Sequence, residues 1–277
     1  MTRPNVPTMD ALLGREYPLL DHGFIRAIDY MGGDDAVVQA ARVSYGAGTK
    51  SVQDDRGLIR YLMRHHHTSP FEHSEIKFHM KMPIFVARQF IRHRTANVNE
   101  YSARYSILDK EFYIPEIQDM GTQSKTNKQG QGSALSVEQA ESIQNLLRED
   151  AERAYAGYQD MLDAGLAREL ARMNLSLNYY TQWYWKVDVH NLMHFLRLRA
   201  DSHAQYEIRI YADVMLQILF TWMPVTYDAF MDYRLHAETF SRQEMQILRA
   251  LVSDIPVGSL SGLSDREANE FRKKLEG

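Results

Sequence analysis

The sequence predicts an α+β fold in which a mixed sheet is flanked by long helices. Residues 75–82 alternate strictly between apolar and polar side chains, which is typical of a half-buried strand. Residues 136–164 instead combine a capping-box start with a long amphipathic pattern that stops at Gly165, which indicates a helix. Helices and strands then alternate without a regular βαβ cadence, so a doubly wound sheet is not favoured.

The first half of the chain offers several elements around the alternating strand. Residues 23–30 read as an early strand, and after a Gly-Gly turn either Asp34 or Asp35 can cap a helix that runs to about residue 42. Residues 51–54 resemble a capping box that opens a helix over 55–63. Pro83 then stands where a helix favours its first residue, and a helical pattern follows it.

The second half begins with a polar, glycine-bearing stretch over 121–133 that has no periodicity and therefore predicts a surface loop. The long helix after it is expected to bury Ile143, Leu146 and Tyr158 on one side. A shorter helix, an aromatic strand, a helix capped by Asp188 and a long helix ended by Pro224 complete the prediction; they cover residues 168–175, 177–185, 188–198 and 204–222.

Composition narrows the class of protein. The chain has 277 residues, of which 44% are hydrophobic and 25% charged, as in soluble globular proteins. We expect one domain over residues 1–277, with 121–135 as a mobile surface loop. No apolar stretch approaches the roughly 18–20 residues that a membrane helix needs, and no signal peptide is visible, so we expect a cytoplasmic protein that binds no membrane.

Charge and cysteine content restrict the chemistry further. The net charge of −4 argues against binding nucleic acid over the whole surface, although a local basic pocket remains compatible with it. The chain contains no cysteine, which excludes disulfides, thiolate metal sites and every mechanism with a cysteine nucleophile.

The densest polar cluster lies at and beyond the end of an apolar helix. It contains Arg92, His93, Arg94, Asn97, Asn99, Glu100, Ser102, Arg104 and Tyr105. Arginines at this density can hold a phosphate through paired charge-assisted hydrogen bonds. They can equally form structural ion pairs in a solvated loop. Spacing alone leaves both interpretations open and indicates only an anion or nucleotide site.

The histidines raise the question of a metal site. Residues 65–67 are all histidine, and His190 and His194 share a helix face. However, Asn191 stands where a zinc protease would have glutamate, so we expect no protein-bound metal. Arg199 and His203 also share a face, with Asp201 nearby, and the simplest interpretation of these three is a surface ion-pair set.

Together these segments resemble the flavin-dependent thymidylate synthases. The family signature of Arg-His-Arg followed by spaced serines and Arg-Tyr is similar to residues 92–105 here, with Asn97 where the family commonly has serine. Residues 67–73, 83–89, 168–172 and 198–205 are similar to further landmarks of the family, in the same order. The likeness extends over about residues 60 to 225.

The resemblance implies the fold of the thymidylate synthase-complementing proteins, assembled as a homotetramer whose active sites lie between subunits. It also implies reductive methylation of dUMP to dTMP. Methylenetetrahydrofolate would supply the carbon, and FAD reduced by NADPH would supply the hydride. The family needs no protein nucleophile, which agrees with the absence of cysteine.

The resemblance also implies roles for individual residues. Arg199 matches the arginine that activates the pyrimidine and is the expected catalytic residue. The expected dUMP contacts are Gln89, Arg92, Glu100, Ser102, Ala103, Arg104, Arg172 and Arg199. The expected FAD contacts are Ser69, Arg92, His93, Arg94, Glu100, Asp188, His190 and His194, and His67 and His203 are expected near the flavin and folate.

Two other classes of function remain as alternatives. The first is a nucleotide- or RNA-binding module that uses the cluster from Arg92 to Arg104, and the second is a metal-dependent hydrolase built on the histidines. A flavin spectrum, retained RNA or stoichiometric zinc in the purified protein would distinguish the three.

Overall fold

The computed structural model describes residues 4–43, 55–125, 130–252 and 262–276. The capping box expected at 51–54 lies outside these residues. Contacts divide the chain into two compact units, Met1–Leu235 and His236–Gly277, which are described separately below. The expected organisation as one domain and the cytoplasmic location stay predictions.

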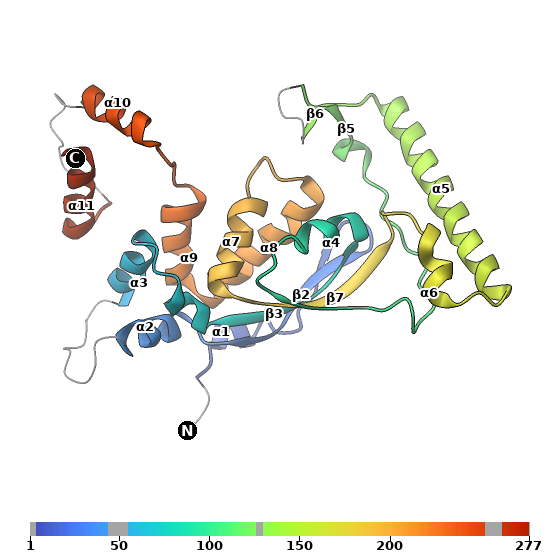
Figure 1. Ribbon diagram of the computed structural model, residues 1–277, viewed down its shortest axis with the longest axis horizontal. Coiled ribbons are helices and arrows are strands. Elements are labelled where there is room, and N and C mark those ends of the chain that lie inside the picture. The colour runs from blue at the N-terminus through green and yellow to red at the C-terminus, as the bar shows by residue number, and fades with distance from the viewer. Residues whose placement is uncertain (1–3, 44–54, 126–129, 253–261, 277) are drawn as a thin grey trace. The chain divides into compact units, whose positions relative to one another are not determined.

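A five-stranded sheet forms the centre of the first unit, with the strand order β1-β2-β3-β7-β4 (Figure 1). Every neighbouring pair is antiparallel, so the expectation of a mixed sheet was wrong. A long stretch of chain connects β3 to β7, so the sequence alone does not show whether these two strands run parallel or antiparallel. The strands are β1 (Tyr17–Leu19), β2 (Gly23–Met31), β3 (Glu75–Pro83), β4 (Asn97–Glu100) and β7 (Tyr180–Asp188).

One face of this sheet is covered by helices α4 (Ile84–Phe90), α7 (Val189–Arg199) and α8 (Tyr206–Trp222), as Figure 1 shows. The alternation predicted for β3 is confirmed, because Ile76, Phe78, Met80 and Met82 are all buried. The Phe90 ring stacks on that of Phe195 with centroids 4.7 Å apart. This packing holds α4 and α7 together over the sheet.

The opposite face of the sheet is polar and only half-buried. Nε of Arg26 donates to Nδ1 of His79 over 3.1 Å, and the His79 ring stacks on Tyr184 with centroids 4.8 Å apart. The helices therefore cover one face of the sheet, and the expectation that long helices flank it holds for that face alone.

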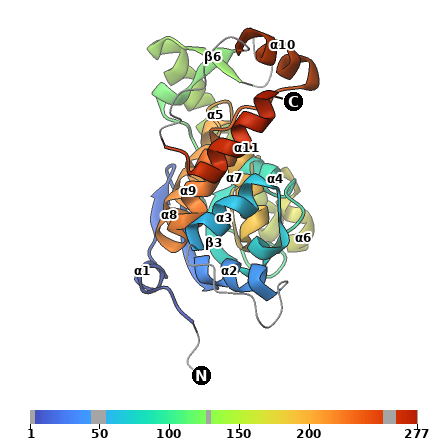
Figure 2. The same ribbon diagram turned by 90° about the vertical axis from the view of Figure 1, so that its left-hand side faces the viewer.

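Three helices lie side by side at one end of the sheet in both Figure 1 and Figure 2: α2 (Asp34–Val43), α3 (Asp55–Arg64) and α9 (Pro224–Phe230). Either Asp34 or Asp35 was expected to cap α2. The Asp34 carboxylate instead accepts hydrogen bonds from the backbone N–H groups of Val225 and Thr226, both 2.9 Å away, and so caps α9. Burial raises the pKa of this carboxyl. The shorter elements of this region are α1 (Pro7–Asp10), η1 (Ser69–His73) and the π-helical turn η4 (Met231–Leu235).

The predicted long helix is α5 (Val137–Asp163), followed by α6 (Arg168–Ala171) and the turn η3 (Arg172–Asn174). Its capping box is confirmed, because Ser136 and Gln139 exchange side-chain to backbone hydrogen bonds, and Gly165 ends it at φ +84°. The expected buried side is partly wrong. Tyr158 is buried in a small second core with Tyr155 and Ala103, but Ile143 and Leu146 are 38% and 56% exposed.

The described residues of the stretch over 121–135 are exposed or half-buried, as expected of a surface loop, but they are not a loop throughout. Strands β5 (Gly121–Gln123) and β6 (Gln131–Ala134) pair antiparallel after the turn η2 (Ile117–Asp119). No apolar alternation marks these short strands because neither has a buried face. The aromatic strand also begins later than expected, at residue 180, because the backbone N–H of Tyr179 closes a turn on Ser176.

The second unit contains helices α10 (Arg242–Val252) and α11 (Asp265–Glu276). Both begin with a reciprocal capping pair, Ser241 with Glu244 and Ser264 with Glu267. Nε of Arg249 donates to the Lys274 carbonyl over 3.0 Å, which joins the two helices. Across the described part of both units, no helix is long and apolar enough to span a membrane.

Candidate functional site

Helix α7 carries or borders many of the side chains that the sequence singled out. Asp188 caps its start, as predicted, because Oδ1 accepts from the Asn191 backbone N–H over 2.9 Å and Oδ2 from the Asn191 amide over 2.7 Å. His190 and His194 follow on one side of the helix. The Asp188 carboxylate therefore has a structural role at the helix start.

Arg199 at the end of α7 is held by His93. Its Nε donates a hydrogen bond to Nε2 of His93 over 3.2 Å, and burial lowers the pKa of the guanidinium. Burial first, and then the charges of Arg199 and His194, lower the pKa of His93 to about 4. His93 is therefore neutral at pH 7, with Nε2 as the acceptor and Nδ1 carrying the proton.

This pair lines a cavity of about 380 Å³, which we call the arginine cavity. Its polar wall consists of Arg92, His93, Arg94, Thr95, Asn191, His194 and Arg199, and none of the described residues that line it is acidic. Several guanidinium groups and the neutral imidazole of His93 facing one volume favour a phosphate or diphosphate group. The structure thus brings together the residues of the Arg-His-Arg motif with His194 and Arg199.

A second cavity of about 620 Å³, the Gln89 cavity, shares His194, Leu198 and Arg199 with the first. Gln89, Asp201 and His203 also line it. The Asp201 carboxylate is engaged with His203, since Oδ1 lies 2.8 Å from both the backbone nitrogen and Nδ1 of His203. No ion pair joins Arg199 to Asp201 among the described residues, so the simple surface-pair interpretation of Arg199 is not supported.

Gln89 belongs to a hydrogen-bonded row of side chains. Its Nε2 donates to Oε1 of Gln205 over 2.6 Å, and Nε2 of Gln205 donates to Oε2 of Glu207 over 2.9 Å. Glu207 is only 6% exposed, and its Oε1 accepts from the Tyr113 hydroxyl over 3.3 Å. Because a carboxylate can only accept, Glu207 fixes the amide of Gln205 and through it the amide of Gln89.

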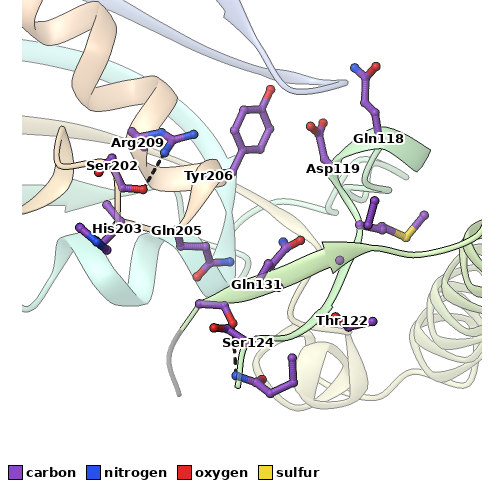
Figure 3. A pocket seen from close by; sticks show the side chains of 17 residues that line it. Gln118, Asp119, Thr122, Ser124, Gln131, Ser202, His203, Gln205, Tyr206 and Arg209 are labelled. Carbon is purple, nitrogen blue, oxygen red and sulfur yellow. Dashed lines mark hydrogen bonds between the residues drawn. The ribbon is translucent and has the colours of Figure 1, made fainter. Parts of the chain in front are cut away.

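A larger cavity of about 820 Å³, the hairpin cavity, continues from the Gln89 cavity through residues 203–205. Figure 3 shows Thr122, Ser124 and Gln131 of the β5–β6 hairpin on one side of it, and Ser202, Gln205, Tyr206 and Arg209 on the other. Nη1 of Arg209 donates to the Ser202 carbonyl over 2.9 Å and holds the turn before α8. The lining is rich in neutral hydrogen-bonding groups.

The remaining expected nucleotide contacts form a second cluster, made up of Glu100, Ser102, Ala103, Arg104 and Arg172. Arg104 lies 3.8 Å from the Glu169 carboxylate, and Nε of Arg172 donates to the Glu169 carbonyl. Glu100 accepts from Thr181 over 2.6 Å. Ala103 is buried at 7% exposure, so it can offer a ligand little beyond its backbone. Among the described residues, no hydrogen bond, ion pair or cavity links this cluster to Arg199.

Ser69 and His67 lie at and just before η1, and both are exposed. His67 lines a small cavity with His190, His194 and Arg234 of η4, and the centroids of the Tyr61 and His67 rings lie 5.8 Å apart. Within the described ranges, no group of three or more His, Asp or Glu side chains could hold a metal ion.

The structure adds residues that sequence reasoning missed. Arg197 stands three residues after His194, so helical spacing could have placed it on the same side. Glu207 and Arg234 carry no local signal, because their importance depends on contacts with distant residues. Gln205 lies inside a segment that the family resemblance covers, but nothing in its spacing reveals its bond to Gln89.

Comparisons with known proteins agree on one family. The model of the thymidylate synthase complementing protein family matches residues 26–225, and that of the thymidylate synthase ThyX C-terminal domain matches residues 238–277. The chain is 59% identical over 271 residues to the flavin-dependent thymidylate synthase of Ruegeria pomeroyi, covering 96% of this chain and 90% of the relative. It is also 59% identical over 275 residues to that of Wolbachia pipientis wMel, covering 99% and 97%.

A solved structure is similar as well. The UMP/dUMP methylase PolB from Streptomyces cacaoi, bound with 5-Br dUMP, has a TM-score of 0.71 and 35% sequence identity. The similarity covers 79% of this chain and 99% of that one.

Proposed function

This chain belongs to the flavin-dependent thymidylate synthases, and we propose that the arginine and Gln89 cavities are where it methylates dUMP to dTMP. It is an FAD-dependent transferase of nucleotide biosynthesis. The single observation that carries the assignment of the site is the Arg199–His93 pair, since it borders both cavities.

The arginine cavity fits the diphosphate of FAD. Arg92, Arg94 and Asn191 supply donors, the neutral His93 supplies one more, and no acidic side chain of the described lining opposes them. FAD, when bound, supplies the hydride that completes the methyl group. The expected contacts Ser69, Glu100, Asp188, His190 and His194 belong to the same proposal, and the Asp188 carboxylate also caps the start of α7.

We assign the activation of the pyrimidine to Arg199. C5 of dUMP must become nucleophilic without a thiolate, which builds negative charge along the N3–C4–O4 or N3–C2–O2 edge of the ring. No described protein group bonds the two terminal nitrogens of Arg199, so they can face that edge while Nε is held by His93. A fixed charge stabilises this developing charge more in the transition state than in the ground state.

The other reactants are part of the proposal. Methylenetetrahydrofolate delivers the methylene carbon to C5, C5 loses its proton, and NADPH supplies the reducing equivalents through FAD. His67 and His203 border cavities on either side of the α7 site and are our candidates for contacts with the flavin and folate.

We further propose that the active site is completed by a second chain of a homotetramer. The expected dUMP residues form two clusters, one around Arg199 and Gln89 and one around Arg104 and Arg172, with no described contact between them. The simplest arrangement for a site that uses both clusters is that each of two subunits contributes one of them.

One experiment tests the function directly. Purified protein is expected to show a flavin spectrum and to release tritium from position 5 of labelled dUMP, with release dependent on FAD and methylenetetrahydrofolate. A colourless protein that retains RNA would favour the nucleotide-binding alternative instead.

A further inference from the structure

The small cavity beside α7, which His67, His190 and His194 line, also contains two guanidinium groups to which the proposed reaction assigns no role. We call it the Arg234 cavity; its volume is about 190 Å³, and it lies among the end of α3, α7 and η4. Met63, Phe71 and Phe230 contribute apolar wall, and Arg197, Arg234 and His66 contribute nitrogen donors and acceptors. None of the described residues that line it is acidic.

Two guanidinium groups face this cavity without a carboxylate to separate them. Burial first, and then the charge of Arg197, lower the pKa of Arg234, which indicates that the two like charges act on each other. Arg197 makes no hydrogen bond or ion pair with any residue that the structure describes. An anion between the two groups would remove this repulsion and give Arg197 a partner.

Arg234 is held in place on the protein side. Its Nη2 donates to the Met63 carbonyl over 2.6 Å, and its Nη1 lies 3.3 Å from Nε2 of His66. The remaining N–H groups of the guanidinium stay available to the cavity. A guanidinium fixed in this way loses little freedom when an oxyanion binds it.

His66 supports this interpretation independently. It ends α3 in a Schellman motif, in which the His67 N–H bonds the Leu62 carbonyl over 3.0 Å and the His66 N–H bonds the Met63 carbonyl over 3.3 Å. Its φ of 60° lies in the left-handed region, at a position that usually takes glycine. A bulky residue tolerated there suggests that its side chain is needed, and that side chain lies against Arg234.

We propose that the Arg234 cavity binds an oxyanion, a phosphate or carboxylate group of a ligand, between Arg197 and Arg234. Planar guanidinium groups bind such anions through paired hydrogen bonds. The proposal rests on the proposed function for the identity of the ligand. The diphosphate of FAD is assigned to the arginine cavity, so two reactants remain as sources. NADPH carries phosphates, and methylenetetrahydrofolate carries glutamyl carboxylates.

The first test measures the anion itself. Inorganic pyrophosphate is titrated into the flavin-loaded enzyme by calorimetry, for the natural protein and for Arg197→Gln, Arg234→Gln and Arg148→Gln. Arg148 lies on α5, where it bonds Asn145, and serves as the matched control. We expect each of the first two changes to weaken binding about tenfold or more, and the control to leave it unchanged. Equal binding by all four proteins would overturn the proposal.

The second test identifies the source in the same variants. It compares two quantities, the KM ratio of NADPH to NADH and the KM ratio of mono- to triglutamyl methylenetetrahydrofolate. A change of about tenfold in one of the two ratios identifies the ligand; unchanged values in both refute the assignment to a reactant. Arg234→Gln is the decisive variant, because Arg234 lines only this one of the described cavities, whereas Arg197 also lines the Gln89 cavity. Tritium release at saturating substrates that survives in it shows that the proposed function stands even if this inference fails.

Discussion

Nε of Arg199 donates a hydrogen bond of 3.2 Å to Nε2 of His93, which ties the end of α7 to the turn three residues beyond the end of α4. The bond requires a neutral His93, because only an unprotonated Nε2 can accept. The protonation state of one residue thus controls the orientation of the other.

Replacing Arg199 by lysine tests its assigned role. Lysine keeps the positive charge, but a single ammonium cannot bond His93 and the pyrimidine edge in the geometry of a guanidinium. We expect Arg199→Lys to keep FAD and much of its affinity for dUMP, while turnover falls by about 10²–10³. Tritium release measures the turnover and the flavin spectrum measures the loading. Turnover near that of an Arg148→Lys control would remove Arg199 from the mechanism.

His93 should make the stability of the fold depend on pH. Its folded pKa of about 4 lies below the unfolded value of 6.5, so the unfolded chain binds more protons between these two values. This contribution to the free energy of unfolding is therefore fully present above about pH 6.5 and is lost as pH falls towards 4. Urea unfolding at pH 7 and pH 5 measures it, and His93→Gln should flatten the difference. A slope that is the same in both proteins would contradict the expectation.

Glu207 should orient Gln89 through Gln205. In Glu207→Gln the side-chain amide offers donors as well as an acceptor, so the orientation of Gln205 is no longer fixed. We expect KM for dUMP to rise about tenfold with a smaller change in kcat, since a hydrogen bond to a charged group contributes roughly 1.5–3 kcal/mol.

The double variant Glu207→Gln/Gln205→Glu separates orientation from mere stability. It returns a carboxylate to the row, which accepts from Gln89 on one oxygen and from the new amide on the other. Gln89 is then oriented as before, and we expect KM for dUMP to recover. If the double variant binds dUMP no better than Glu207→Gln, the row does not position Gln89.

Mixed subunits test whether two chains share a site. Arg199→Ala and Arg172→Ala disable different clusters, so about a quarter of the sites in a randomly mixed tetramer should hold both arginines. Each variant alone should be inactive, and activity should reappear after mixing under dissociating conditions. Arg199→Ala mixed with Arg92→Ala provides the control, because both residues line the arginine cavity of one chain. Equal activity in the two mixtures would argue against a shared site.

Local signals predicted much of the fold. The alternation of β3, the capping box at Ser136 and the cap at Asp188 depend on neighbours within a few residues, and all three are confirmed. The antiparallel direction of β7 depends on a partner far away in the chain, and no local pattern encodes it. The exposure of Ile143 and Leu146 could not be predicted locally either, because an amphipathic pattern does not show which part of the chain packs against its apolar side.

The residues of the candidate site likewise include some that sequence signals revealed and some that they did not. The arginines of residues 92–104 stood out by their density, and the family resemblance assigned them roles that remain to be tested. The Gln205–Glu207 bond and the pairing of Arg234 with His66 arise only after the chain has folded, so sequence spacing could not reveal them.

Because His66 has a left-handed conformation, replacing it is expected to change the stability of the fold and the binding of the anion in opposite directions. Glycine adopts this conformation without strain, whereas other residues pay roughly 1–2 kcal/mol, so His66→Gly should raise the free energy of unfolding by about 1 kcal/mol. The same change removes the imidazole beside Arg234 and should weaken pyrophosphate binding, and paired calorimetric and urea measurements check both signs. Screening variants of this enzyme for thermostability alone would therefore select glycine at position 66 and discard affinity for the anion unnoticed.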